Sequence, residues 1–501
     1  MAILKEWLND LSYELLTGDI ETEVSDVISD SRKAAEGKVF VALPGARADG
    51  HDYITDVYEK GVRVFVVERE LSGLSLPKEA SDVTVLRTSD NRKALAVLSA
   101  ARFGNPFNRM ISIGVTGTKG KTTVTTMIKT VLESSGHKVG LIGTNGCFIS
   151  GKRTPTVNTT PESYELHEDF ARMVEEGCEY VVMECSSQGF KLHRTYGLNF
   201  DYGIFLNLSP DHIGPAEHES FEEYLHCKSM LLTQSRTCIV NDDAKMTPDV
   251  IREAGIPEER IRRFSITHDA FETATDIEYI CTADFTGTRF KTKGLSNADV
   301  LLPLPGYFNI ENTLSVVTVC ALLGISDEDI AEGILATSVN GRMEVVVRND
   351  TFTIFVDYAH NEVSMVSLVE TLRNDYKPKR LVVLFGCGGN RSKDRRTGMG
   401  GAAAHSADLT IITSDNPRYE NPEDIVNDIH EAFIAAGGRE ENCVCVVDRR
   451  EAIRYAMEHA QKGDMIAVIG KGHEDYVERN GVRTHFLDRE VILEEKEKLG
   501  L

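Results

Sequence analysis

Short runs of β-branched and aromatic residues alternate along the chain with longer stretches in which apolar residues recur at helical spacing. In the N-terminal part, this pattern predicts strands at residues 39–43 and 62–67 and helices at residues 53–60 and 90–101. Residues 103–106 read FGNP, and glycine and proline at this point favour a loop. We therefore predict that residues 1–105 form a separate domain.

The central part has the strand and helix alternation of a parallel α/β sheet. Its predicted strands are residues 138–142, 180–184, 202–206 and 237–240, with a helix at residues 163–176. Functional groups are expected at the carboxyl ends of such strands, which meet at one edge of the sheet. Glu184 ends one strand, and Asp211 and His212 follow another. We predict that this second domain covers residues 106–338.

A second doubly wound sheet is predicted after Gly341. Its strands are residues 353–356, 380–384, 409–413, 444–447 and 465–469, and its helices include residues 361–375 and 451–461. The glycine cluster at residues 386–389 follows a strand and favours close approach of the backbone to an anion. The predicted third domain covers residues 339–501, so the fold class is α/β with three domains.

The composition matches a soluble protein of several domains. Of the 501 residues, 41% are hydrophobic and 27% are charged, and no apolar run approaches the length of about 18 residues that a membrane helix needs. We expect neither a signal peptide nor insertion into a membrane. The net charge of −23 argues against non-specific binding of nucleic acid, which is itself a polyanion.

The ten cysteines are spread singly along the chain, apart from Cys443 and Cys445. There is no Cys-x-x-Cys pair and no histidine spacing that is typical of a structural zinc site. We therefore expect reduced thiols in a cytoplasmic protein.

The strongest local motif is SIGVTGTKGKTTV at residues 112–124, where a β-branched run leads into glycines and then into a predicted helix. The glycines allow a tight turn whose N–H groups face phosphate oxygens at the start of the helix. Lys121 is expected to neutralise the β- and γ-phosphates, and the Thr122 hydroxyl to bind magnesium. Because Val115 occupies a position that is glycine in the strict motif, we expect Gly114 and Gly117 to supply the flexibility. An ordinary glycine-containing turn is the alternative.

Eight motifs together resemble the Mur ligases: TGTKGKTT, NTTP, MECSSQG, GYFNIEN, GRME, VDYAHN, SDNPR and GKGHE. The matches occur in the family's order over nearly the whole chain. The resemblance implies an N-terminal uridine-nucleotide domain, a central P-loop ATPase with a mostly parallel sheet, and a Rossmann-like C-terminal domain. It also implies an ATP-dependent amide ligase that adds the third amino acid to a UDP-N-acetylmuramoyl dipeptide through an acyl phosphate. We expect a monomer.

The resemblance implies a role for each residue that matches a motif. The catalytic residues are Lys121, Glu184, His212 and Lys228, and the magnesium ligands are Thr122, Glu184, His212 and Lys228 as a carbamate. The ATP-binding residues are Thr116, Gly117, Thr118, Lys119, Gly120, Lys121, Thr122, Asn309, Arg342 and Asp357. The residues that bind the uridine-linked dipeptide are Ser29, Ser31, Ala46, Arg47, Ala48, Asn158, Thr159, Thr160, Ser186 and Arg194. The residues that bind the incoming amino acid are Arg391, Asp415, Asn416, Pro417, Arg418, Gly470 and Glu474.

The DNPR sequence at residues 415–418 favours diaminopimelate as the incoming amino acid. Diaminopimelate is lysine with one additional carboxylate, and a guanidinium can bind a carboxylate through two hydrogen bonds. Among the Mur ligases that the chain resembles, the lysine-adding members generally lack this sequence. Two segments depart from the usual pattern: Asn390 and Ser392 stand where aspartates are common, and residues 211–228 contain an insertion similar to that of lysine-adding members.

Three alternatives remain open at this point. The chain could add L-lysine, because of the departures just described. A folate polyglutamate synthetase uses the same ATPase chemistry but lacks the DNPR sequence. A catalytically silent paralogue would bind nucleotide only, although the intact Lys121, Glu184, His212 and Lys228 argue against it.

Overall fold

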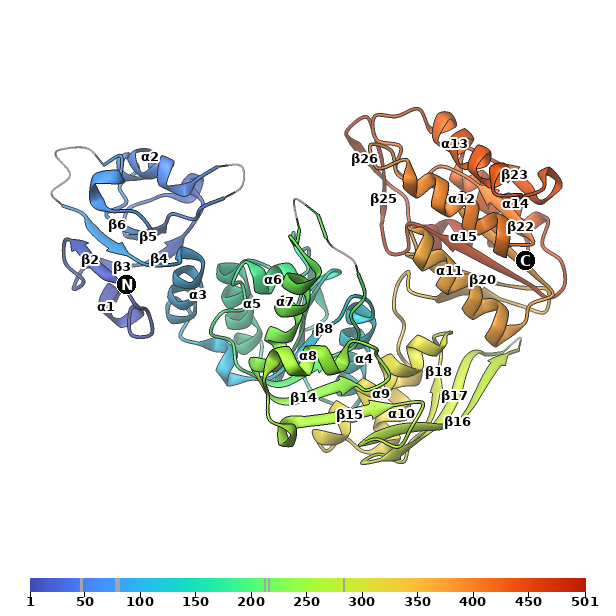
Figure 1. The fold of residues 1–501 in the computed structure, drawn as a ribbon, viewed down its shortest axis with the longest axis horizontal. Helices are drawn as coiled ribbons and strands as arrows, with labels where there is room; N and C mark the ends of the chain where they lie inside the picture. Colours follow the sequence, from blue (N-terminus) through green and yellow to red (C-terminus); the bar gives the residue numbers. More distant parts are fainter. Residues whose placement is uncertain (46–47, 77–81, 211–212, 215–216, 283) are drawn as a thin grey trace. The chain divides into compact units, whose positions relative to one another are not determined.

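The computed structural model describes residues 1–45, 48–76, 82–210, 213–214, 217–282 and 284–501. The chain divides into two compact units, Met1–Phe271 with Thr318–Ile325 and Glu272–Val317 with Ser326–Leu501. Figure 1 shows helices packed on the faces of several separate sheets. Within the described ranges, none of the helices has the length and apolar character required to cross a bilayer.

The first unit begins with a five-stranded sheet in the order β2-β7-β6-β5-β4. The elements are β2 (Glu14–Thr17), β4 (Asp26–Ile28), β5 (Lys38–Val41), β6 (Val64–Val67), β7 (Thr84–Arg87), α2 (Ile54–Glu59) and α3 (Asn91–Arg102). The β4, β5, β6 and β7 strands run parallel, whereas β2 pairs with β7 antiparallel. The helices α2 and α3 pack on opposite faces of this sheet, as the alternation of buried residues along β5 requires.

A second sheet in this unit contains a parallel core in the order β9-β12-β8-β13-β14-β15. Its strands are β8 (Ile111–Thr116), β9 (Val139–Gly143), β12 (Tyr180–Glu184), β13 (Phe200–Phe205), β14 (Ser235–Asn241) and β15 (Ile261–Ser265). Its helices are α4 (Lys121–Ser134), α5 (Ser163–Glu175), α6 (Ser187–Lys191), α7 (Phe221–Thr233) and α8 (Thr247–Ala254). The short strands β10 (Gly146–Ile149) and β11 (Lys152–Thr154) extend the β9 edge antiparallel. The strands predicted in this region are all confirmed.

The second unit starts with three antiparallel strands, β16 (Glu272–Cys281), β17 (Thr286–Gly294) and β18 (Asp299–Leu302). They precede α9 (Tyr307–Leu322) and α10 (Asp327–Leu335). The apolar pattern of the sequence does not predict these strands, because their charged and polar residues interrupt it. Tyr376, which precedes β21 (Arg380–Phe385), contacts β17, since its hydroxyl donates a hydrogen bond to the Gly287 carbonyl at 3.2 Å.

The C-terminal sheet has the order β19-β20-β24-β21-β22-β23, and only β19 runs antiparallel to its neighbour. The strands are β19 (Glu344–Arg348), β20 (Phe352–Asp357), β21 (Arg380–Phe385), β22 (Leu409–Ile412), β23 (Cys443–Cys445) and β24 (Asp464–Ile469). The helices are α11 (Glu362–Thr371), α12 (Asp394–Ser406), α13 (Pro422–Ala435), α14 (Arg449–Glu458) and α15 (Asp488–Leu499). The first three helices cover one face and the last two the other, which confirms a doubly wound domain (Figure 1).

A buried ion pair joins the two helices α14 and α15 beneath the edge of this sheet. Arg449 donates from Nε and Nη2 to the two carboxylate oxygens of Asp488, each at 2.7 Å, and both side chains are almost fully buried. The same Nη2 donates to the Ile469 carbonyl at 3.0 Å. Arg449 therefore fixes the carboxyl end of β24 relative to both helices.

Asp448 caps α14 directly before this ion pair, because its Oδ1 accepts from the N–H groups of Arg450 and Glu451 at 2.9 and 3.0 Å. We expect Asp448→Ala to lower the free energy of unfolding by about 1 kcal/mol, because these two N–H groups lose their acceptor. Asp448→Asn should retain most of the stability, since asparagine is an equally good cap. Urea unfolding monitored by circular dichroism measures both variants, and equal losses would show that the cap is not responsible.

Candidate active site

The predicted phosphate loop is present between β8, which ends at Thr116, and α4, which begins at Lys121. The loop is held by the segment that follows β13, because Asn207 accepts the Thr118 N–H with its carbonyl and the Lys119 N–H with its side chain, both at 3.0 Å. Thr116 Oγ1 donates to the Cys185 carbonyl at 2.8 Å. These contacts fix the loop before any nucleotide binds.

The prediction that Gly114 supplies loop flexibility is wrong, because Gly114 lies within β8. A Cβ atom there would be 2.7 Å from Leu231 Cδ1, so this glycine is required by packing. A larger residue at position 117 would be crowded, since a Cβ atom there would lie 3.0 Å from the Lys119 carbonyl oxygen. The left-handed turn falls on Gly120, whose φ is 91°.

Two lysine side chains converge beneath the loop. The Nζ atoms of Lys121 and Lys228 each donate to the Gly117 carbonyl at 2.8 Å. Lys228 is 1% exposed, and its Nζ lies 4.8 Å from the centre of the Tyr224 ring. Two ammonium groups on one oxygen concentrate positive charge where a polyphosphate would bind, although in the absence of an anion they repel each other.

Glu184 occupies the predicted position at the end of β12, next to the phosphate loop, and is 1% exposed. Its carboxylate accepts from the Thr144 N–H at 3.0 Å and from the Thr144 hydroxyl at 3.1 Å. Carboxylate and hydroxyl oxygens are ligands that magnesium prefers, so Glu184 and Thr122 fit such an ion. His212, the third expected ligand, lies outside the described residues.

Gly143, at the end of β9, provides the space for the Glu184 carboxylate. A Cβ atom at Gly143 would lie 2.3 Å from Glu184 Oε1, so we expect Gly143→Ala to displace the carboxylate and lower the rate of ATP turnover by about tenfold or more. Gly73→Ala is the matched control, because the nearest atom to its Cβ would be 3.8 Å away. Steady-state release of ADP measures both, and equal rates would exclude this role for Gly143.

The NTTP segment, which is expected to bind the dipeptide, lies beside Glu184. Thr160 Oγ1 donates to the Glu184 carbonyl and accepts from the Ser186 N–H, both at 2.9 Å. Thr159 Oγ1 lies 3.0 Å from Thr144 Oγ1. Asn158 precedes them in the same loop and is partly exposed. These residues therefore surround the strand end that carries Glu184.

Arg194 is held against the same segment. Its Nη1 donates to the Thr160 carbonyl at 3.0 Å, and its Nη2 pairs with Glu162 at 2.7 Å. The buried Nε has no hydrogen-bond partner among the described residues. These two contacts use two of the five N–H donors of the guanidinium, so the remaining Nη donors could pair with an anionic substrate group.

The residues expected to bind the uridine nucleotide lie at the carboxyl edge of the N-terminal sheet. Ser29 follows β4 directly, Ser31 begins a short 3-10 helix, and Ala48 follows β5 and is exposed. The Arg32 guanidinium donates hydrogen bonds to both carboxylate oxygens of Asp30, and these bonds lower the pKa of that carboxyl group to about 2. Ala46 and Arg47 lie outside the described residues.

In the second unit, the residues expected to bind ATP are engaged in local contacts. Asn309 in α9 is 2% exposed and donates from Nδ2 to the Pro305 carbonyl at 2.6 Å. The two carboxylate oxygens of Asp357 accept the N–H groups of Met343 and Ala359 at 2.8 and 2.7 Å. The Arg342 guanidinium lies 4.7 Å from the centre of the Tyr358 ring.

The residues expected to bind the amino acid come together at the carboxyl ends of β21, β22 and β24. Asn416 Nδ2 donates to Glu474 Oε2 at 2.8 Å. A Cβ atom on Gly470 would lie 3.0 Å from Asp415 Oδ2, so the GKGHE and DNPR loops touch at this glycine. Burial and the nearby Asp415 carboxylate raise the pKa of Glu474.

Side-chain atoms of Arg418 and Arg391 both lie close to Gly388. A Cβ atom on Gly388 would be 3.0 Å from Arg418 Nη1 and 3.9 Å from Arg391 Cγ. Arg418 Nη1 donates to the Gly389 carbonyl at 2.7 Å. Pro417 approaches the same turn, since its carbonyl would be 2.0 Å from a Cβ on Gly389. The glycine cluster thus leaves space for the Arg418 side chain and for the DNPR backbone.

The backbone of Arg418 is held in the left-handed region with a φ of 52°. A hairpin of β25 (Tyr476–Arg479) and β26 (Val482–His485) holds it there. The Arg418 N–H donates to the Glu478 carbonyl at 2.9 Å, and its own carbonyl accepts the Asn480 N–H at 2.7 Å.

The two positions that depart from the usual pattern have local structural roles. Asn390 has a φ of 53°, a conformation that asparagine tolerates well, and its Oδ1 accepts the Tyr419 N–H at 3.1 Å. Ser392 Oγ accepts the Asp394 N–H at 3.2 Å at the start of α12. Both residues therefore support the loop that carries Arg391.

Several residues of the site were not predicted. Thr144 directly follows β9 and Asn207 lies two residues after β13, so their positions at strand ends were the available signal. Lys471 is fully buried, and its Nζ lies 3.7 Å from Glu474 Oε2 and 4.0 Å from Asp415 Oδ1. Its place inside GKGHE did not distinguish it from the neighbouring glycines.

Comparisons with known proteins match all three parts of the chain. The Mur ligase family catalytic domain matches residues 23–103, the Mur ligase middle domain residues 115–320, and the Mur ligase glutamate ligase domain residues 341–472. The UDP-N-acetylmuramoyl-L-alanyl-D-glutamate–2,6-diaminopimelate ligase of Clostridium perfringens is 38% identical over 495 residues, 98% of each chain. A ligase of the same name from Clostridium acetobutylicum is 39% identical over 496 residues, again 98% of each chain. A solved structure of such a ligase has 26% identity and a TM-score of 0.73, over 100% of this chain and 99% of that chain.

Proposed function

The chain belongs to the Mur ligase family, and we propose on that basis that it is the ATP-dependent ligase that adds meso-2,6-diaminopimelate to UDP-N-acetylmuramoyl-L-alanyl-D-glutamate in peptidoglycan biosynthesis. The observation that carries the proposal is the full-length similarity to relatives of this name, 38% over 98% of the chain. The cluster of Arg418, Arg391 and Glu474 supports the choice of amino acid.

The reaction that this proposal requires has two steps. First, the γ-phosphoryl group of ATP passes to a carboxylate oxygen of the D-glutamate side chain, and ADP leaves. The amine of diaminopimelate then attacks the acyl carbon, the C–O bond to phosphate breaks, and the amine loses a proton. A carboxylate becomes a useful electrophile only after its oxygen has been converted into a leaving group.

The phosphate loop binds and orients ATP in the first step. The N-terminus of α4 presents N–H groups and partial positive charge, and Lys121 adds a full charge. Two anions must approach each other during phosphoryl transfer, so charge neutralisation and alignment account for most of the catalysis. The contacts from Asn207 keep the loop aligned for this purpose.

Thr122 and Glu184 are the described residues that would hold magnesium, and His212 is the third proposed ligand. When bound, magnesium would neutralise phosphate charge in this site. We also propose that Lys228 is carbamylated. A carbamate retains one N–H, so the hydrogen bond from Nζ to the Gly117 carbonyl is compatible with it, and the repulsion between Lys228 and Lys121 is removed.

The loops at the carboxyl edge of the C-terminal sheet select the amino acid. Arg418 retains donors beyond the one used for Gly389 and can pair with the distal carboxylate of diaminopimelate. Glu474 offers a carboxylate for the distal ammonium, and Asn416 orients it. L-lysine would leave the Arg418 guanidinium without its carboxylate partner, which disfavours that substrate.

The proposal extends to the arrangement of the chain and its setting. Residues 1–105 would bind the uridine nucleotide, residues 106–338 ATP, and residues 339–501 the amino acid. Asn158, Thr159, Thr160, Ser186 and Arg194 would bind the muramoyl dipeptide beside Glu184. We expect a monomeric enzyme that acts in the cytoplasm.

A comparison of two acceptor amines tests this function. With ATP, magnesium and the uridine-linked dipeptide, we expect kcat/KM to be at least tenfold higher for meso-diaminopimelate than for L-lysine, because the carboxylate contact contributes more than about 1.4 kcal/mol. The readout is amide product quantified by mass spectrometry. A preference for lysine would establish the lysine-adding alternative, and no product with any diamino acid would reject the ligase function.

A further inference from the structure

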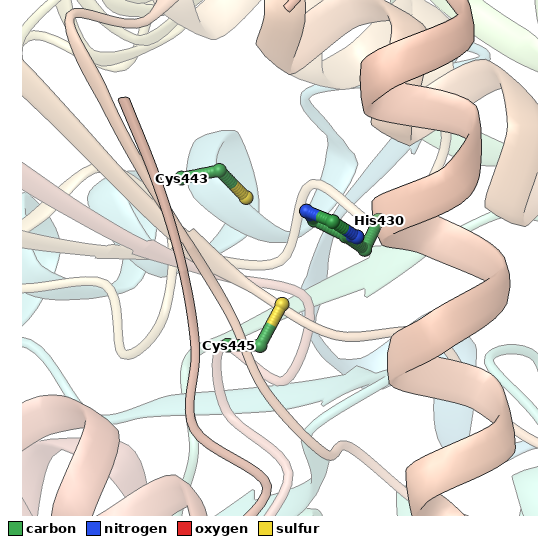
Figure 2. Close-up of side chains that lie close together, drawn as sticks. All are labelled: His430, Cys443 and Cys445. Carbon is green, nitrogen blue, oxygen red and sulfur yellow. The ribbon is translucent and has the colours of Figure 1, made fainter. Parts of the chain in front are cut away.

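Three side chains of types that commonly bind metal ions meet in the C-terminal domain, on elements other than the loops that contain Arg418 and Glu474. They are His430 on α13 and Cys443 and Cys445 on β23 (Figure 2). One ligand atom from each lies within 4.8 Å of the others. Figure 2 shows the imidazole and the two sulfur atoms directed toward a common space between the helix and the strand.

The fold explains why residues from two elements converge here. Cys443 and Cys445 pair with Thr410 and Ile412 of β22, and alternate residues of a strand point to the same face. That face is covered by α13, whose buried residues include Ile429, next to His430. Cys443 packs against the same hydrophobic cluster. The three residues do not have the sequence spacing of a typical zinc site. They meet only because α13 packs against β23 and places His430 beside the two cysteines.

We propose that His430, Cys443 and Cys445 form a binding site for zinc or a similar thiophilic divalent cation. Two thiolates and an imidazole are a donor set typical of zinc. Metal–ligand bonds of about 2.0–2.3 Å place the ligand atoms of a tetrahedral site roughly 3.3–3.8 Å apart. The observed limit of 4.8 Å is within reach of small side-chain rotations.

The surroundings of the cluster support binding from solution. The His430 side chain is 27% exposed, Cys443 is partly exposed and Cys445 is exposed, so an ion can enter without local unfolding. Glu440 Oε2 lies 3.2 Å from His430 Nε2. This carboxylate adds negative charge beside the imidazole, and water would complete the coordination of the ion. The ion links α13 to the edge strand β23 and therefore stabilises this edge of the domain.

A disulfide between the two cysteines is the competing arrangement. Cys443 and Cys445 are two residues apart on β23. Their Cα atoms are therefore separated by about 6.6 Å, which is near the upper limit for a disulfide. The pair is therefore better placed to share a metal ion than to form a covalent bond. Counting thiols in the unreduced protein distinguishes the two states.

The experiment uses the reduced, metal-free full-length protein. Zinc is titrated in competition with a chromophoric chelator, and cobalt(II) is titrated without oxygen while thiolate-to-metal charge-transfer absorption is recorded. The variants are a double Cys443→Ser and Cys445→Ser protein, His430→Ala, and Cys281→Ser as the control with an exposed cysteine on β16. The readouts do not depend on ligase activity, so they test the site independently of the proposed function.

We expect wild type and Cys281→Ser to bind one zinc equivalent that the double variant lacks, and His430→Ala to bind it at least tenfold more weakly. Zinc should also raise the thermal unfolding midpoint of the wild type but not of the double variant. Equal zinc stoichiometry in wild type and the double variant would overturn the proposal. A cobalt(II) complex without thiolate absorption, or a disulfide between Cys443 and Cys445 in the protein as purified, would overturn it as well.

Discussion

Lys228→Ala is expected to reduce the rate of product formation by about 10²- to 10³-fold. The side chain is buried beneath the phosphate loop, where its Nζ shares the Gly117 carbonyl with Lys121. If Lys228 carries a carbamate, the substitution removes an anion from the site and leaves a small space. A short carboxylate such as acetate or propionate should then partly restore the rate.

Two controls separate this effect from a general loss of structure. Lys129→Ala changes a lysine of α4 that pairs with Glu133 near the surface, and it should retain nearly full activity. Protein equilibrated with ¹³C-bicarbonate should show a carbamate signal in NMR spectra that Lys228→Ala lacks. Full activity of Lys228→Ala without any effect of carboxylates would remove the carbamate from the mechanism.

Arg418→Ala should raise KM for diaminopimelate by roughly 30- to 4000-fold, which corresponds to about 2–5 kcal/mol for the loss of one partner from a desolvated charge pair. The KM for ATP should change by less than about threefold, because ATP binds elsewhere in the proposed site. Arg418→Lys should give an intermediate value, since lysine keeps the charge but cannot form two parallel hydrogen bonds.

Arg479→Ala is the matched control for this substitution. Arg479 is the exposed neighbour of Arg418 across the isolated backbone bridge, so its side chain can be removed without loss of that bridge. Initial rates over a range of each substrate measure the three variants. Equal increases in KM for diaminopimelate and ATP would show that Arg418 does not bind the amino acid.

The parts of the site that depend on short stretches of sequence could be predicted. The phosphate loop and Glu184 are examples, because a strand, its carboxyl end and the following turn are encoded within about a dozen residues. The doubly wound C-terminal sheet was predicted for the same reason. The structure also explains Asn390 and Ser392, whose roles in a turn and at a helix start are local but were not recognised.

The other features depend on contacts between distant residues. Gly114 looks like a loop glycine in sequence, but Leu231 of α7 determines its role. Thr144 supports Glu184 only because β9 and β12 are neighbours in the sheet. The approach of His430 to Cys443 and Cys445 depends on how α13 packs on β23. Single-sequence patterns contain no information on such pairings.

The left-handed backbone of Arg418 has a consequence for attempts to exchange specificity between ligases. The conformation is held by a hydrogen bond from the Arg418 N–H to the Glu478 carbonyl and one from the Asn480 N–H to the Arg418 carbonyl, and both partners belong to a hairpin far along the chain. A DNPR tetrapeptide grafted alone into a lysine-adding enzyme would carry the guanidinium without the support that aims it. The unit to transplant would therefore be the loop together with its hairpin.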